Sequence, residues 1–322
     1  MIMKKLLLLL LCAFSVHAID IDLDKNPYRP TLEKEDMLIY NELKPLFETN
    51  KNEALRLLKE KTSTDRSASF AYIEGILNLQ MKKPQDSIAP LKEAIKKMPS
   101  FVDAHRALAQ AYNQTNQLAK TNTQLLKIIS LGFGDAKLWS SVASLYHQQE
   151  NYLAAETAYR NALVFDPSNK NLLSSLAQVY LNEEKYTNAQ VILKQLLKDS
   201  PKSRQLRLSL INCQLKLGKN TKALENFEIA NHFQLLKSRD LITMADLYEE
   251  EKNAELAVLY YQTALKDKTL KKELVLYCLQ ALLRNDKNKA FASHIATIPQ
   301  ASLKPQELEQ LSPTEWRQSC EK

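Results

Sequence analysis

Small and aromatic residues between positions 136 and 169 recur at helical spacing. In AKLWSSVASLYHQQENYLAAETAYRNALVFDPSN, Trp139, Ala143 and Tyr146 follow one another at steps of four and three residues. The same steps return further on at Ala155, Tyr159 and Ala162. Steps of three and four place side chains on one face of an α-helix. The segment therefore predicts two packed helices, in which alanines let the backbones approach and aromatic rings fill the remaining space.

This pattern returns at one fixed period in both directions along the chain. Counted from Ala136, the other units begin, without insertion or deletion, at Ala68, Val102, Lys170, Arg204 and Ser238. Their eighth positions are mostly small, namely Gly75, Ala109, Ala143, Ala177, Ile211 and Ala245. A closing proline stands at Pro99, Pro167 and Pro201 and is replaced elsewhere by Phe133, Leu235 and Thr269. Because one helix pair cannot bury its apolar face alone, the pattern predicts an all-α stack of six units over residues 68–271, without strands.

Less regular segments flank these units. Residues 32–67 carry a helix-pair pattern displaced by about one residue, and Pro45 should interrupt its first helix. We expect a degenerate capping repeat there, preceded by an extended lead-in at residues 19–31. Residues 272–298 predict an atypical terminal helix pair, and residues 299–322 a C-terminal cap segment.

Two of the four glycines, Gly132 and Gly134, lie in a single turn between two units. A closing proline is also missing from that turn. We therefore expect a helix C-terminus whose geometry differs from that of the neighbouring repeats.

The first eighteen residues have a pattern unlike that of the repeats. Lys4 and Lys5 precede an apolar run over residues 6–16, and Val16-His17-Ala18 resembles a cleavage site. The run is shorter than the about 20 residues that a membrane-spanning helix needs. Residues 1–18 thus predict a signal peptide, an exported chain and no stable membrane insertion after cleavage. Lipidation at Cys12 is the alternative, which the large Leu11 before it disfavours.

Charge and chemistry exclude several functions. The formal net charge is +7, and removal of Lys4 and Lys5 lowers it by two. A mild surplus without a basic stripe does not predict nucleic-acid binding. There is no glycine-rich phosphate loop, no G-x-S-x-G, no CxxC and no metal-binding histidine spacing. We therefore expect no enzyme, no metal and no cofactor.

The cysteines beyond the signal segment predict no internal bridge. Cys213 and Cys278 lie in first helices two repeats apart, too distant for a disulfide, and should be buried as small apolar side chains. Cys320 is either an unpaired thiol or a partner for another molecule.

The repeats resemble the tetratricopeptide repeat family, whose 34-residue signature reads W-x2-L-G-x2-Y, A-x3-F and P. This resemblance implies a right-handed superhelical α-solenoid with first helices along its concave face. Positions 2, 5, 9, 12 and 13 of each unit then point into the groove. The partner-binding residues implied are Arg106, Gln110, Asn113, Ser140, Ser144, His147, Ser174, Gln178, Asn182 and Asn212.

The ninth positions form a row of uncharged polar residues: Gln110, Ser144, Gln178 and Asn212. Amides and hydroxyls both donate and accept, so such a row can bond the backbone of an extended peptide. The alternative is that these are ordinary solvated helix-surface residues. Some relatives bind acidic chaperone tails through basic and amide residues at fixed positions, a clamp that this chain lacks.

The segments LGFGDAKLW, YLAAETAYRNAL, KALENFEIA and ELAVLYYQTAL resemble periplasmic repeat proteins associated with TonB-type energy transduction in Gram-negative bacteria, over roughly residues 88–266. The leading hypothesis is a periplasmic, non-enzymatic adaptor that binds a protein or peptide of the cell envelope. The alternative is a structural assembly factor for the outer membrane or exported polysaccharide, acting through its convex face or by self-association.

Overall fold

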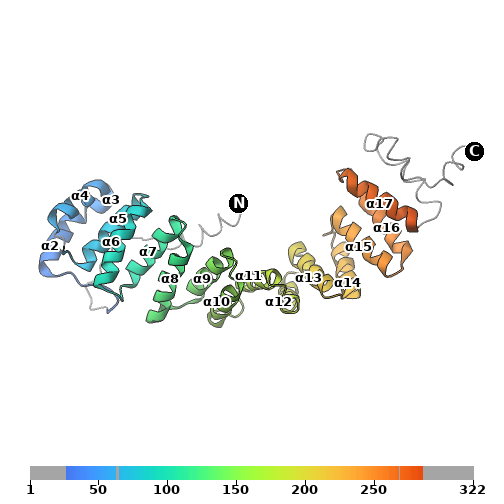
Figure 1. Ribbon diagram of the computed structural model, residues 1–322, viewed down its shortest axis with the longest axis horizontal. Coiled ribbons are helices and arrows are strands. Elements are labelled where there is room, and N and C mark those ends of the chain that lie inside the picture. Colours follow the sequence, from blue (N-terminus) through green and yellow to red (C-terminus); the bar gives the residue numbers. More distant parts are fainter. Residues whose placement is uncertain (1–26, 63–64, 268, 286–322) are drawn as a thin grey trace, which may run out of the picture. The chain divides into compact units, whose positions relative to one another are not determined.

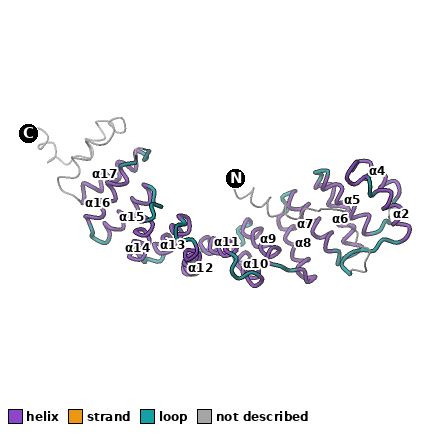
Figure 2. Tube along the Cα trace, turned by 180° about the vertical axis from the view of Figure 1, so that it is seen from behind, coloured by secondary structure: helices purple, strands orange, loops and turns teal. Residues whose placement is uncertain are grey.

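The computed structural model describes residues 27–62, 65–267 and 269–285. Within these ranges all regular structure is helical, and Figure 2 shows helices joined by short loops. The predicted signal peptide, the second half of the terminal pair and the C-terminal cap segment lie outside them. No helix among the described residues is long and apolar enough to cross a membrane. The fold is the predicted all-α array of stacked helix pairs.

The helices form two compact units, Met1–Val179 and Tyr180–Lys322. The first contains α2 (Lys34–Leu43), α3 (Leu46–Thr49), α4 (Lys51–Lys61), α5 (Ala68–Gln80), α6 (Pro84–Lys97), α7 (Val102–Gln114), α8 (Leu118–Ile128), the π-helical turn η1 (Ile129–Phe133), α9 (Ala136–Gln148) and α10 (Tyr152–Phe165). The division falls within α11 (Lys170–Asn182). The second contains α12 (Tyr186–Asp199), α13 (Arg204–Lys216), α14 (Asn220–His232), α15 (Ser238–Glu250), α16 (Ala254–Leu265) and α17 (Lys272–Asn285). The first helices of the repeats begin at the six residues from which the units were counted.

The turn inside each repeat ends its first helix in the same way. The fifteenth position has a left-handed backbone at Lys82, Asn116, Glu150, Glu184, Gly218 and Lys252. The backbone N–H of the sixteenth position donates to the carbonyl of the eleventh, as Asn151 does to Tyr146 at 2.9 Å. This Schellman arrangement satisfies carbonyls that the helix end leaves open. It keeps every second helix at the same offset from its first.

The turn that contains Gly132 and Gly134 differs from the others, as predicted. After α8 the chain continues as η1, in which Gly132 has a φ of 92°. A Cβ on Gly134 would lie 3.4 Å from Nε1 of Trp139, so the turn packs closely on α9. The turn leaves Phe133 37% exposed.

Close helix packing at the eighth position is confirmed. Ala109, Ala143, Ala177 and Ala245 are all buried. At Gly75 the approach is closer still, since a Cβ there would lie 2.4 Å from Cγ of the buried Leu91. The missing side chain of Gly75 therefore makes room for Leu91 of α6.

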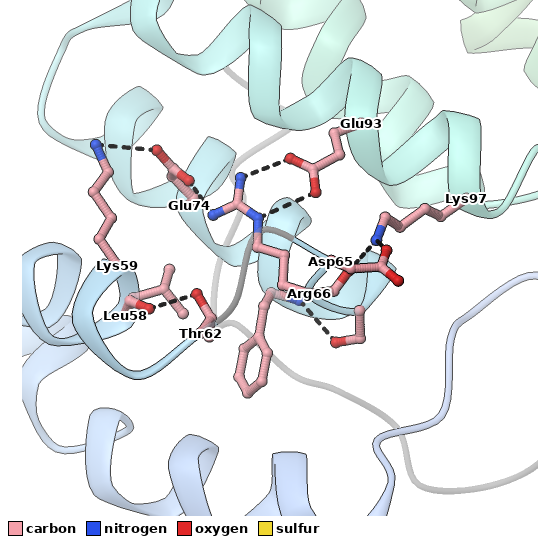
Figure 3. A network of polar contacts seen from close by, with 10 residues as sticks. Leu58, Lys59, Thr62, Asp65, Arg66, Glu74, Glu93 and Lys97 are labelled. Carbon is pink, nitrogen blue, oxygen red and sulfur yellow. Dashed lines mark hydrogen bonds and ion pairs between the residues drawn. The ribbon is translucent and has the colours of Figure 1, made fainter.

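The capping repeat is interrupted at Pro45, as predicted, and α2 ends at Leu43 before α3 begins at Leu46. Ion pairs join its end to the first regular repeat (Figure 3). Arg66, in the connection after α4, bonds Glu74 of α5 and, through Nη2, Oε2 of Glu93 of α6 at 2.8 Å. The Arg66 side chain is only 13% exposed. Carboxylates from both helices thus balance a nearly buried guanidinium.

The two described cysteines are free and buried, as predicted. Cys213 lies on α13 and Cys278 on α17. Burial raises the pKa of the Cys213 thiol to about 11 and that of Cys278 to about 12. Both side chains serve as small apolar residues of the second unit.

Candidate peptide-binding face

Three candidate residues form one stripe on α7. Arg106, Gln110 and Asn113 follow at steps of four and three residues, and all three are half-buried. Residues so spaced share one face of a helix. The buried residues Ala107, Leu108 and Ala111 alternate with them. We call the surface built by such stripes the first-helix face.

The equivalent stripe on α9 consists of Ser140, Ser144 and His147, again half-buried. The hydroxyl of Ser144 lies 3.1 Å from that of Tyr159 on α10, so the second helix holds it in place. The His147 ring packs against Tyr152 with centroids 5.7 Å apart. Burial lowers the pKa of His147, so its imidazole is neutral at pH 7.

The remaining candidates lie on α11 and α13. Ser174 and Gln178 are exposed and belong to the first unit, whereas Asn182 and Asn212 are exposed and belong to the second. The first unit thus holds Gln110, Ser144 and Gln178 at the ninth positions of three successive repeats. Asn212 continues the row by position in the repeat.

Direct contact between α5 and α7 shows how first helices adjoin within the first unit (Figure 1). Packed helices lie about 8–10 Å apart, whereas an extended peptide rises about 3.2–3.4 Å per residue. A peptide crossing successive first helices would therefore meet a new ninth-position side chain about every third residue.

In the second unit, tyrosines hold carboxylates at the equivalent positions of a first helix. Tyr261 of α16 and Tyr277 of α17 both donate to Oδ1 of Asp246, the latter at 2.8 Å. Tyr261 also donates to Oε2 of Glu249 at 3.1 Å. Asp246 and Glu249 occupy the ninth and twelfth positions of their repeat. The two carboxylates make this part of α15 acidic, and the phenol hydrogen bonds fix their orientation.

A second pair of tyrosines shares one carboxylate. Tyr248 and Tyr260 stack with ring centroids 5.7 Å apart, and both hydroxyls donate to Oε1 of Glu228, at 2.5 and 2.8 Å. Burial, followed by the bond to Glu228, raises the pKa of Tyr260 to about 12. Sequence reasoning missed both tyrosine groups, although the concentration of four tyrosines in residues 248–277 was a visible signal.

No group of three or more metal-ligating side chains occurs in the part of the chain that the structure describes. The acidic run at 249–251 ends α15. Its first member, Glu249, accepts the hydrogen bond from Tyr261.

Sequence reasoning also missed an intramolecular contact at the start of the face. Arg29, in the lead-in before α2, donates from Nε to Oδ2 of Asp103 at 2.9 Å. Asp103 is the second residue of its repeat and lies on the same side of α7 as Arg106. Arg29 and Asp103 are 74 positions apart, so no local sequence pattern could predict their contact.

Among protein-family models, one described as Tetratricopeptide repeat matches residues 50–272. No curated protein matches the chain. Solved structures that resemble it include a tetratricopeptide repeat protein from Parabacteroides merdae, with 14% identity, TM-score 0.44 and coverage of 78% of this chain and 100% of that one. YrrB, described as a TPR protein with an unusual peptide-binding site, has 17% identity, TM-score 0.43 and coverage of 64% and 97%. MamA has 17% identity, TM-score 0.42 and coverage of 50% and 94%.

The identities are low and these TM-scores lie below 0.5, so the assignment depends on the family model and on the repeats themselves. The family model matches well over half of the sequence, over the residues where helix pairs return at a constant period. The chain belongs to the tetratricopeptide repeat family, a scaffold fold for protein interaction.

Proposed function

We propose that the protein is a non-enzymatic adaptor whose first-helix face binds an extended peptide segment of a partner protein. The observation that carries this proposal is the row of uncharged polar residues at the ninth positions, Gln110, Ser144 and Gln178, on successive first helices of one unit. All three lie at the surface, half-buried or exposed, while their helical neighbours fill the core. Family membership supports the same role.

Recognition on this face uses the peptide backbone more than peptide charge. Amide and hydroxyl groups both donate and accept, so each ninth-position side chain can bond either an N–H or a carbonyl of an extended chain. The Tyr159 hydroxyl orients Ser144, which lowers the entropy lost on binding. Arg106 adds a positive charge at the fifth position beside the row.

A pull-down with purified protein tests this proposal. The variant Gln110→Ala/Gln178→Ala/Asn212→Ala removes three amides and should lose the specific partner captured from an envelope extract. A matched control, Thr123→Ala/Thr157→Ala/Thr187→Ala, changes exposed polar residues of second helices and should keep it. Retention of every specific partner by the first variant would show that the face is assigned wrongly.

We further propose that the adaptor works in the periplasm of a Gram-negative bacterium, within a TonB-type transport complex. Support comes from the signal-like segment at residues 1–18 and from the resemblance over residues 88–266. Fractionation of cells expressing the full chain should recover a shortened product in the periplasmic fraction. Recovery of the uncleaved chain in the cytoplasm would contradict export.

A second candidate function, assembly through the opposite face, is favoured by apolar side chains on second helices. Leu153 and Val164 of α10 are 69% and 75% exposed, and they lie on one side of that helix. Light scattering of the wild type and of Leu153→Glu/Val164→Glu would decide. An oligomer that the double variant dissociates supports assembly, whereas a monomer in both cases favours the adaptor.

A further inference from the structure

Three consecutive residues before the first helix are held against the repeat that begins at Val102 and the turn that precedes it. The carbonyl of Pro27 accepts a hydrogen bond from the Ser100 hydroxyl at 3.0 Å. The ring of Tyr28 meets Phe133 edge to face, with centroids 4.7 Å apart. Arg29 forms its ion pair with Asp103 at 2.9 Å. Backbone, aromatic ring and charge each have a partner, which is how a peptide ligand is usually held.

These contacts lie at the start of the first-helix face. Asp103 precedes Arg106 by three residues and Gln110 by seven, so the three form one stripe on α7. Tyr72, at the fifth position of the preceding repeat, has a pKa that burial raises, that Asp103 raises further and that Arg29 lowers. The segment therefore occupies surface beside the row of ninth-position residues.

The Phe133 ring is available because its turn departs from the pattern. Three other repeats have proline at the equivalent position, whereas Gly132 and η1 here present a phenylalanine at the surface. Phe133 is 37% exposed even with Tyr28 against it. An aromatic ring kept outside the core by a glycine turn is suited to receive another ring.

We propose that Ser100, Asp103 and Phe133 form a binding site for an aromatic residue followed by a basic residue, and that a partner peptide of this chemistry binds by displacing the chain's own Tyr28–Arg29. Asp103 selects the positive charge, Phe133 the ring, and Ser100 the backbone carbonyl before them. This inference rests on the proposed function, since it assigns the partner's chemistry on the same face.

The ion pair between the internal segment and Asp103 is partly open to water. The side chains of Arg29 and Asp103 are 36% and 30% exposed, and ion pairs open to water are weak. A competing peptide must find the site vacant, so its apparent affinity is its intrinsic affinity multiplied by the fraction of molecules in which Tyr28–Arg29 has left. Removal of the internal residues should therefore tighten peptide binding.

A labelled peptide with the sequence of residues 25–32, KNPYRPTL, is the probe. Fluorescence anisotropy measures its binding to the full-length wild type and to Tyr28→Ala/Arg29→Ala. We expect the double variant to bind about tenfold more tightly, as its site is vacant. In that background Asp103→Ala or Phe133→Ala should each weaken binding severalfold, while Thr123→Ala on α8 should leave it unchanged.

Reversing the charge at position 103 distinguishes a loss of recognition from a loss of folding. Asp103→Arg should lose KNPYRPTL and gain the peptide in which aspartate replaces arginine, with an unchanged circular dichroism spectrum. Equal affinity of wild type and Tyr28→Ala/Arg29→Ala, or no binding to the latter, would overturn the inference. The Gln110→Ala/Gln178→Ala/Asn212→Ala variant should still bind the probe, so failure of the proposed function and failure of this site give different results.

Discussion

At the scale of single residues, the eighth position of each repeat limits how closely two helices approach. Alanine suffices at Ala109 and Ala143, whereas Gly75 faces Leu91 at a distance that leaves no room for a methyl group. At Gly75 the short distance to Leu91 therefore decides which residue the position accepts. The sequence alone predicted a small residue there but not that Leu91 makes glycine necessary, because the distance between helices depends on both side chains.

A double-mutant cycle tests this contact. Gly75→Ala should lower the free energy of unfolding by about 1–3 kcal/mol because the added Cβ overpacks the site. In a Leu91→Ala background the same change should be neutral or stabilising by up to about 1 kcal/mol, since the clash is gone and alanine favours a helix. Denaturant unfolding of the four proteins measures both effects. An equal cost in the two backgrounds would mean that Gly75 and Leu91 do not limit each other.

The buried thiols give a second prediction at this scale. In the variant Cys12→Ser/Cys320→Ser only Cys213 and Cys278 remain. Burial raises both thiol pKa values, so little thiolate forms at pH 8 and a thiol reagent should react only after denaturation. An added exposed cysteine, Thr123→Cys, should react at once and serves as the control. Rapid labelling of the native double variant would place these thiols at the surface.

At the scale of elements, the constant period of the repeat sets where each helix begins, and it was legible from the sequence. The polar contacts between neighbouring repeats were harder to predict from the sequence. His105 and Arg207, both at the fourth position, bond the carbonyl of the preceding closing proline, at 3.0 Å to Pro99 and 2.8 Å to Pro201. A fourth-position residue was expected only to fill space, as Trp139 does. Only the structure shows that the turn places the proline carbonyl within hydrogen-bond distance of the fourth-position side chain.

The turns within repeats yield a prediction at this scale. Gly218 and Glu150 occupy the same left-handed position, with φ of 65° and 58°. A Cβ on Gly218 would meet open space, so only the backbone conformation resists a larger residue there. Gly218→Ala should therefore lower the midpoint of thermal unfolding, because the left-handed conformation is strained for any residue with a Cβ. Glu150→Gly should shift the unfolding midpoint in the opposite direction or leave it unchanged, and a stabilising Gly218→Ala would contradict the assigned turn geometry.

At the scale of the whole molecule, repetition explains both the success and the limit of sequence reasoning. The fold can be predicted because every repeat carries the same pattern of small and aromatic residues. The candidate row Gln110, Ser144 and Gln178 can be predicted because its members share one position in that pattern. The contacts of Tyr28 and Arg29 with the repeat at Val102 do not repeat, and they join residues far apart in the chain. Such contacts depend on how stacked helices place distant segments together, which periodicity does not encode.

The central claim is that partners bind the first-helix face, and site-specific photo-crosslinking in cells tests it most directly. A photoreactive residue placed at Gln110 or Ser144 should give a covalent adduct with a partner protein, while one placed at Leu153 or Thr157 on α10 should give none. Adducts from Leu153 and Thr157 together with none from Gln110 and Ser144 would contradict the account.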